Sequence, residues 1–262
     1  MTVDAEFATH LVAIIVSFGV GVPVIARAIR GHDWPAGLLG AALVFDGVEW
    51  LSWSIAVTEP VSDMRVGAAL AIVCRLAISA AAVCMLAFTV SVFRRGNSVA
   101  RASAFALGAA LGAGFLGSGA VGDWGGWRSD HPWVWVELGT QLLVYGWATW
   151  EPLAYHAVMR RRVALGLTSP LVAHRCLLWS AYAGMFLITQ IGYMATFALP
   201  ESPPALGLLL TWLTISGEVA LWLAFFPPAR YARWIESQRR TATIATDALA
   251  GSQPEPEVES GT

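Results

Sequence analysis

The sequence predicts an all-α integral membrane protein, a bundle of seven transmembrane helices with its N-terminus outside and its C-terminus in the cytoplasm. Of the 262 residues, 56% are hydrophobic and only 13% are charged, and the mean hydropathy is +0.60. Soluble domains carry about a quarter of charged residues, so this composition is typical of a chain that contacts lipid. The arginines are also concentrated in alternate loops, which predicts the orientation.

Seven segments are long and apolar enough to cross a bilayer, which takes about 20 residues. The first has Asp4 and Glu6 on its N-terminal flank. A secretory signal would be basic there, so we interpret this segment as a span and not as a cleaved signal. The predicted spans are Ala8–Ala26, Pro35–Val57, Val66–Phe93, Ala102–Val121, Pro132–Val158, Leu171–Leu199 and Pro204–Phe226.

The orientation follows from the arginines, because the chain contains no lysine. Only Arg65 and Arg128 fall in the loops of the other side, which are acidic, and Arg75 lies within a span. The positive-inside rule places the arginine-rich loops in the cytoplasm, as expected for a multi-pass protein of the cell membrane. These loops and the C-terminal segment contain Arg27, Arg30, Arg94, Arg95, Arg101, Arg160, Arg161, Arg162, Arg175, Arg230, Arg233, Arg239 and Arg240.

The domain organisation is simple. Residues 1–234 are predicted to form one transmembrane domain. Residues 235–262 lose the apolar content and end in alternating prolines and glutamates, a composition that predicts a disordered acidic cytoplasmic tail. No segment is long enough for a soluble catalytic domain.

The fourth predicted span is rich in glycine, and Gly108 and Gly112 form a GxxxG pair. Small residues let helix backbones approach closely in lipid. We expect this helix to pack inside the bundle, with dimerisation through the same face as the alternative.

Polar residues inside the spans are the candidates for function, because a charge near the bilayer centre costs several kcal/mol. Asp46 and Glu49 are three residues apart and therefore share a helix face. We expect Arg75, at similar depth in the next span, to pair with one of these acids and leave the other without a partner. The remaining candidates are Glu137, Gln141 and Tyr145 on one stripe of the fifth span, Gln190 and Tyr193 in the sixth, and Glu218 in the seventh.

An unpaired carboxyl in an apolar site tends to keep its proton, which suits a general acid. A purely structural role stays open for each residue singly, since buried ion pairs and lone glutamines often only join helices. The four acids together favour a function, because one arginine cannot neutralise them all. Glu151 and His156 lie near the cytoplasmic end, and we interpret them as residues that reach toward water.

Tryptophan is abundant, with 13 residues. Trp34, Trp133 and Trp135 fit an interfacial belt. Six tryptophans lie deeper: Trp50, Trp53, Trp147, Trp179, Trp212 and Trp222. We expect several of them to line a pocket in which an aromatic face attracts a cation, and others to face lipid.

Metal and cofactor sites are not predicted. Cys74, Cys84 and Cys176 show no CxxC spacing, so they are interpreted as apolar packing residues. No HxxxH, HExxH or DDxxD pattern occurs, so no metal site is expected. Nothing in the sequence predicts a cofactor or a nucleic-acid partner.

The absence of lysine excludes a rhodopsin, because retinal forms a Schiff base with a lysine. Buried acids would suit an ion-coupled transporter, but the seven segments show no inverted repeat or matching pair of broken helices. A membrane enzyme with acid chemistry and a ligand-sensing seven-helix module remain.

The stretch from Arg27 to Trp50, which reads RAIRGHDWPAGLLGAALVFDGVEW, resembles the first loop and second helix of the membrane-bound, metal-independent terpene cyclases of meroterpenoid and indole-terpenoid pathways. That family has seven spans and an essential glutamate beside an aromatic residue in the second helix, where Glu49 and Trp50 stand here. It also carries an acid in the last helix, where Glu218 stands. The resemblance implies protonation of an epoxide or alkene on a prenyl chain, followed by cyclisation of the cation and loss of a proton.

On this hypothesis Glu49 is the proton donor, and Asp46 or Glu218 assists or takes the final proton. The substrate would be a lipophilic small molecule that enters from the bilayer, among the membrane lipids, and a dry aromatic cavity would protect the cation from water. Substrate-binding residues would be Arg75, Glu137, Gln141, Tyr145, Gln190, Trp50 and Trp53.

The alternative rests on the segment from Phe225 to Trp234, FFPPARYARW. It resembles the exit from the membrane input domains of some bacterial sensor kinases. A module of this kind binds a ligand among its helices and passes motion inward. No output domain follows here, so an unidentified protein partner would be required.

Overall fold

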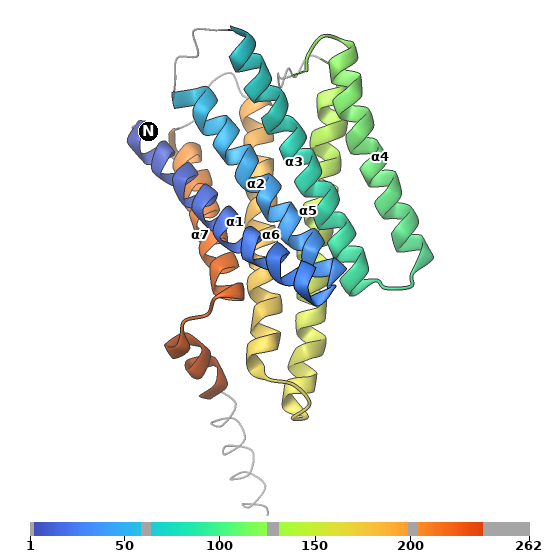
Figure 1. Cartoon of the computed structure of the whole chain (residues 1–262), viewed down its shortest axis with the longest axis vertical. Helices are drawn as coiled ribbons and strands as arrows, with labels where there is room; N and C mark the ends of the chain where they lie inside the picture. Colours follow the sequence, from blue (N-terminus) through green and yellow to red (C-terminus); the bar gives the residue numbers. More distant parts are fainter. Residues whose placement is uncertain (1–2, 59–63, 125–130, 199–203, 238–262) are drawn as a thin grey trace, which may run out of the picture.

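The computed structural model describes residues 3–58, 64–124, 131–198 and 204–237. These residues form seven long helices and a shorter helical stretch over residues 229–237 (Figure 1). The long helices are α1 (Val3–Gly31), α2 (Trp34–Thr58), α3 (Met64–Phe93), α4 (Ser98–Ala120), α5 (Pro132–Ala164), α6 (Pro170–Ala198) and α7 (Pro204–Phe225).

Each predicted span coincides with one of these helices, with ends that differ by up to six residues. Among the described residues, six helices are long and apolar enough to cross a membrane: α1, α2, α3, α4, α6 and α7. The chain is therefore a helical, multi-pass membrane protein. The helix outside this group, α5, is the longest at 33 residues, but Glu137, Gln141 and Glu151 make it more polar than the others.

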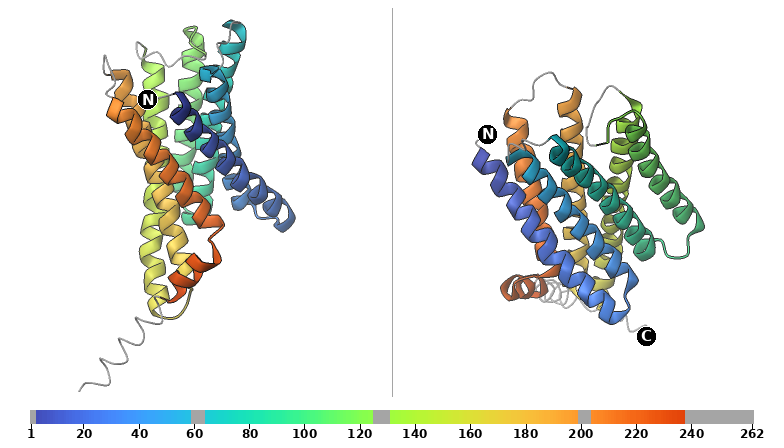
Figure 2. Two further views of the ribbon diagram at one scale, coloured as in Figure 1. Left: turned by 90° about the vertical axis from the view of Figure 1, so that its left-hand side faces the viewer. Right: turned by 45° about the horizontal axis from the view of Figure 1, so that its top comes forward.

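Consecutive helices run in opposite directions and pack side by side (Figures 1 and 2). α1 packs against α2 and α7, while α2 packs against α3. α5 contacts α3, α4 and α6, and α7 closes the arrangement against α6 and α1. α4 packs against only α3 and α5 in the described chain, and it lies at the edge of the bundle in Figure 1.

The core receives side chains from all seven long helices, and it is built from aliphatic and aromatic side chains. Leu43, Met85, Tyr145 and Leu221 are among its buried members. Close packing of α1 on α2 depends on glycine, because a Cβ added at Gly21 would lie 2.9 Å from the carbonyl oxygen of Gly40. Small residues thus allow backbone contact between these helices, as expected in a membrane.

The short connections are specified by local chemistry. His32 takes the left-handed conformation, with φ of 53°, and ends α1, while the Asp33 side chain accepts a hydrogen bond from the Ala36 amide at the start of α2. Asn97 caps α4 in the same way by accepting from the Ala100 amide at 3.1 Å. Both devices satisfy amides that a helix start leaves unpaired.

The arginines gather at one end of the bundle, which we call the arginine-rich end. The α1–α2, α3–α4 and α5–α6 connections and the end of α7 all lie there (Figure 1). Of the described arginines, only Arg65 and Arg75 lie elsewhere. The sorting by side that the sequence predicts is thus present in the fold.

The prediction for Gly108 and Gly112 is wrong. A Cβ added at either glycine would meet no described atom within 4 Å, so this pair does not pack inside the bundle. The glycines that permit close packing of α4 on α5 are Gly114, where an added Cβ would lie 2.9 Å from the Cβ of Glu137, and Gly117, where it would overlap the Trp133 ring. The error concerns which face of α4 is turned inward.

The predicted boundary at residue 234 falls within the helical stretch 229–237. Ile235 in that stretch is buried. The remainder of the predicted tail, residues 238–262, lies outside the described residues. So do five charged residues of the loops on the side opposite the arginine-rich one: Glu59, Asp63, Arg128, Asp130 and Glu201.

Candidate functional site

A fully buried ion pair joins α3 to α5. The Nε and Nη2 atoms of Arg75 donate to the same oxygen of Glu137, at 2.9 and 2.6 Å. Both side chains have no solvent exposure. The second oxygen of Glu137 accepts from the Ser79 hydroxyl at 2.8 Å. This carboxylate therefore has a matched cation and hydrogen bonds on both oxygens, which is the arrangement that makes a buried charge tolerable.

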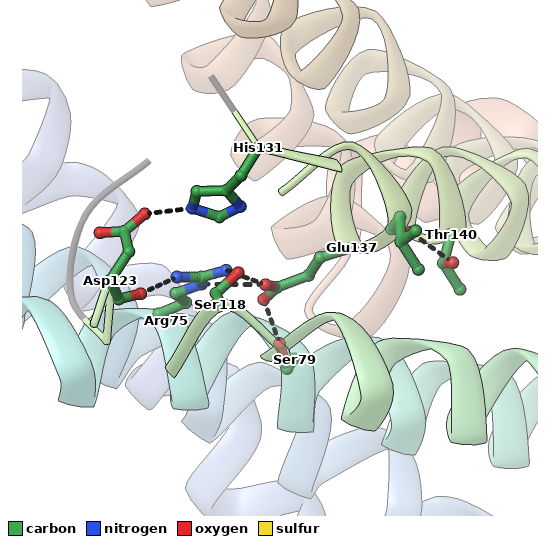
Figure 3. Close-up of polar contacts among 8 residues, drawn as sticks. Arg75, Ser79, Ser118, Asp123, His131, Glu137 and Thr140 are labelled. Atoms are coloured by element: carbon green, nitrogen blue, oxygen red, sulfur yellow. Dashed lines mark hydrogen bonds and ion pairs between the residues drawn. The ribbon is translucent and has the colours of Figure 1, made fainter. Parts of the chain in front are cut away.

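The same arginine also reaches α4 and its C-terminal turn. Nη1 donates to the backbone carbonyl of Asp123 at 2.9 Å, and Nη2 donates to the Ser118 hydroxyl at 2.5 Å. Figure 3 shows the guanidinium held between these groups and Glu137, with His131 bonded to the Asp123 carboxylate above it. Since Nε, Nη1 and Nη2 all donate within the protein, Arg75 is positioned as a structural tie among three helices.

This geometry corrects the expected pairing. Arg75 was predicted to pair with Asp46 or Glu49, but it pairs with Glu137. The reason is the rotation of α3 about its own axis, which turns Arg75 toward α4 and α5 and away from α2. The positive charge of Arg75 therefore does not neutralise Asp46 or Glu49.

Three further acids form a separate group, which we call the acid cluster: Asp46 and Glu218, which are buried, and Glu49, which is half-buried. Asp46 on α2 is 3% exposed and accepts a hydrogen bond from the Ser17 hydroxyl of α1 at 2.7 Å. It is close enough to interact electrostatically with Glu49 and with Glu218 of α7. None of the three forms an ion pair with a described arginine.

Two members of the acid cluster have a buried oxygen without a partner. Oε2 of Glu49 and Oε2 of Glu218 are inaccessible to solvent and form no hydrogen bond in the described structure. Burying a charged oxygen without a partner is costly, so these carboxyl groups are best accommodated when they carry a proton. The cluster therefore differs chemically from the Arg75–Glu137 pair.

Glu49 borders a cavity of about 110 Å³ in the half of the bundle away from the arginine-rich end. Trp50 and Trp53 come to its wall from α2, and Gln190 comes from α6. All three were predicted to bind substrate. The other lining residues are Cys74, Ile78, Leu138, Phe186, Thr189 and Tyr193.

The remaining predicted binding residues do not line this cavity. Arg75 and Glu137 are occupied with each other. Gln141 is fully buried, and neither atom of its amide finds a hydrogen-bond partner. Tyr145 packs behind the cavity wall, with its ring centroid 4.3 Å from that of Phe186, and it interacts electrostatically with Asp46 and Glu49.

Sequence reasoning missed several neighbours of the acid cluster. Ser17 was not singled out, because a serine in an apolar span is common. Tyr182 of α6 interacts electrostatically with all three acids. His10 is buried against Trp50, with ring centroids 5.2 Å apart. Its distance in sequence from α2 concealed this contact.

Glu151 and His156 have structural partners toward the arginine-rich end. Glu151 is buried, and its Oε1 accepts from Arg94 at 2.7 Å and from the Trp147 indole at 2.8 Å. Nδ1 of His156 bonds the Ala173 carbonyl at 2.7 Å. Protein groups, rather than the water expected from the sequence, satisfy both side chains.

Within the described parts of the chain, no group of three or more His, Cys, Asp and Glu residues is arranged to hold a metal ion. The cavity beside Glu49 is lined by this one carboxyl group together with aromatic, aliphatic and uncharged polar side chains.

Comparisons with known proteins give no family. No protein-family model matches the chain, and searches of curated proteins and of solved structures return no significant match.

Proposed function

We propose that this protein is a membrane terpene cyclase, in which Glu49 protonates a prenyl or epoxyprenyl chain and starts its cyclisation. The single observation that carries the proposal is Glu49 itself, which borders a cavity with aromatic walls and has an Oε2 buried without a partner. The resemblance of the Arg27–Trp50 stretch to the metal-independent cyclases supports the same role for this glutamate.

The proposal includes α5 as the seventh span, with the arginine-rich end in the cytoplasm of a cell-membrane protein. The 33 residues of α5, at about 1.5 Å per residue, give a helix about 50 Å long. This length exceeds the roughly 30 Å thickness of a hydrocarbon core. Its polar residues Glu137 and Gln141 are fully buried in the protein and so do not face lipid. The arginine sorting supports the orientation through the positive-inside rule.

The proposed reaction moves one proton in and one proton out. The carboxyl of Glu49 gives its proton to an alkene carbon or epoxide oxygen of the substrate, and an internal double bond attacks the cation to close a ring. Trp50, Trp53 and Phe186 stand around the cavity, where their ring faces stabilise positive charge. A proton leaves the final cation for a nearby carboxylate, so the product is an isomer of the substrate.

Asp46 is best placed for the second proton transfer. The Ser17 hydroxyl donates to Oδ2 of Asp46, and this hydrogen bond favours the charged carboxylate. Glu218, with its unpartnered oxygen, would keep its proton and stay neutral. The three acids would thus divide into one base and two neutral acids.

The cavity size defines what part of the substrate is enclosed. Its volume of about 110 Å³ is below the roughly 300–1,000 Å³ of pockets that enclose whole drug-sized ligands. It would therefore hold the reacting end of a prenyl chain. Trp53 and Tyr193 are partly exposed at the cavity wall, which gives the rest of a lipophilic chain a path from the bilayer.

The test is an assay of membranes with prenylated and epoxyprenylated substrates. Glu49→Gln keeps the size of the side chain but removes the proton, so product formation should fall by at least a hundredfold, in the range found for general acids. Glu151→Gln is the matched control, because this buried glutamate lies away from the cavity, and it should retain activity. Undiminished cyclisation by Glu49→Gln would exclude the proposed role.

The sensor alternative is favoured by one observation. The helical stretch 229–237 folds back on the start of α6, where the Tyr231 hydroxyl bonds Nε2 of His174 and the two rings lie 5.6 Å apart. Burial raises the pKa of the Tyr231 phenol, so this hydroxyl stays neutral at physiological pH. A bundle that changes shape on ligand binding could move this stretch relative to a partner protein.

A comparison of lipid extracts by mass spectrometry, with and without the gene, separates the two functions. A terpenoid that disappears with the gene and with Glu49→Gln supports the cyclase. An unchanged extract, together with a kinase or regulator encoded beside the gene, supports the sensor.

A further inference from the structure

A second cavity, of about 640 Å³, lies toward the arginine-rich end. It lies among the ends of α1, α2, α3, α6 and α7, with Pro152 of α5 at its inner wall. In the left view of Figure 2, α1 slants away from α6 toward this end. The cavity is remote from Glu49 and shares no lining residue with the site proposed for cyclisation.

This cavity is apolar inside and cationic at its rim. Phe88, Trp179 and Phe225 form a contiguous aromatic wall, with ring centroids of Trp179 lying 5.5 Å from Phe88 and 6.2 Å from Phe225. Arg27 of α1 and Arg175 of α6 line the cavity and are exposed. Neither arginine forms a hydrogen bond or ion pair with any described residue.

Asp33 also lies at the rim. Its Oδ1 accepts the Ala36 amide at 3.2 Å, so this carboxylate is engaged in starting α2. It keeps its negative charge there, and the two guanidinium groups outweigh it at the rim.

A buried donor lies in the aromatic wall of the same cavity. Trp179 is 6% exposed, and its indole Nε1 has no hydrogen-bond partner in the described structure. Buried tryptophan N–H groups usually have a partner, and this one belongs to a residue of the cavity wall. An ester or phosphoester oxygen of a bound molecule would satisfy it.

From these observations we infer that the second cavity is a binding site for a phosphate-bearing amphiphile, whose apolar chain packs on the aromatic wall and whose phosphate pairs with Arg27 and Arg175. Arginine suits phosphate because its planar group donates two parallel hydrogen bonds. The volume is within the range of pockets that enclose small molecules. A membrane phospholipid and a soluble alkyl or prenyl phosphate share this chemistry.

The experiment uses the full-length protein in a neutral maltoside detergent, with dodecyl phosphate as the soluble probe. Binding is measured by isothermal titration, and retained phospholipid is measured by native mass spectrometry after extraction from vesicles that contain phosphatidylglycerol. At a membrane surface each arginine strengthens the binding of an anionic group by about fivefold. The double variant Arg27→Gln/Arg175→Gln should therefore weaken dodecyl phosphate binding by about thirtyfold. The control Arg161→Gln/Arg162→Gln removes the same charge at the same end but outside the cavity, and it should bind normally.

Two further measurements separate an amphiphile site from a simple anion site. Inorganic phosphate should bind far more weakly than dodecyl phosphate, since it cannot use the aromatic wall. Trp179→Phe, which keeps the apolar ring but removes the donor, should weaken dodecyl phosphate by about fivefold, the worth of one hydrogen bond. Equal binding of inorganic phosphate, or equal loss in the two arginine pairs, would overturn the inference.

The titration with dodecyl phosphate and the measurement of retained phosphatidylglycerol together identify the source of the ligand. Binding of dodecyl phosphate without retained phosphatidylglycerol supports a soluble amphiphile, and retention of phosphatidylglycerol that the Arg27/Arg175 pair abolishes supports a membrane lipid. Absence of both would contradict the site. The result is independent of the cyclase proposal, because none of these variants alters the acid cluster.

Discussion

The Arg75–Glu137 pair and the acid cluster are both buried among apolar helices, yet they satisfy their charges in opposite ways. Glu137 has an arginine on one oxygen and a serine hydroxyl on the other. Glu49 and Glu218 each keep an oxygen with no partner. The difference teaches that burial alone does not mark a reactive acid, because a fully paired carboxylate is held in place and has no proton to give.

The largest effect should come from breaking the paired region. Arg75→Met leaves Glu137 as an uncompensated buried charge, which should lower the free energy of unfolding by about 3–5 kcal/mol. Unfolding by a denaturing detergent, followed by circular dichroism, measures the loss. The double variant Arg75→Met/Glu137→Met should lose less than the single one, since both charges are gone. Equal losses would mean that Arg75 acts through its contacts with α4 rather than through this pair.

A smaller effect is expected where α4 approaches the same pair. A Cβ at Gly114 would lie 2.9 Å from the Cβ of Glu137 and 3.0 Å from its amide nitrogen. Gly114→Ala should therefore push α4 away and cost about 1–3 kcal/mol in the same unfolding measurement. Gly112→Ala is the control, because its Cβ would meet open space, and it should be neutral or slightly stabilising. A reversed order would show that the outward face of α4 is misassigned.

Substitutions at the acid cluster should change the free energy of unfolding less. A clear loss is expected only where Asp46 accepts its hydrogen bond. Ser17→Ala removes the hydroxyl that donates to Asp46 and should lower the free energy of unfolding by about 1 kcal/mol, the value of one buried hydrogen bond. In the cyclase assay the same variant should slow product formation, because Asp46 is the proposed base. No change in either quantity would remove Ser17 from the cluster.

The smallest effect is expected at Glu218. Glu218→Gln replaces an unpartnered neutral acid with a neutral amide of the same size, so the free energy of unfolding should change by less than about 1 kcal/mol. Glu137→Gln is the contrasting variant, and it should cost several times more because it leaves Arg75 unpaired. Similar costs for these two substitutions would erase the distinction between the regions.

Helix positions could be predicted from the sequence, because apolar runs of span length are visible in any membrane protein. The acids also stood out, since charges are rare within such runs. The pairing of Arg75 could not be predicted, because a span that is apolar on all sides does not show which face is turned toward which neighbour. The outward position of Gly112 and the contact of Ser17 with Asp46 were hidden for the same reason.

The cavities required the structure for a different reason. Trp50, Trp53 and Gln190 were expected at a pocket and do line one, because they share the depth and side of Glu49. Arg27, Arg175 and Trp179 lie on α1 and α6, and no local pattern connects them. Their common cavity arises only from the divergence of the helices toward the arginine-rich end.

The most direct test of the central claim is infrared difference spectroscopy of the protein in lipid bilayers at neutral pH. The account predicts a carbonyl band of a protonated carboxylic acid that is lost in Glu49→Gln and persists in Glu137→Gln. A spectrum with no such band, or a band that only Glu137→Gln removes, would show that Glu49 holds no proton and would contradict the proposed chemistry.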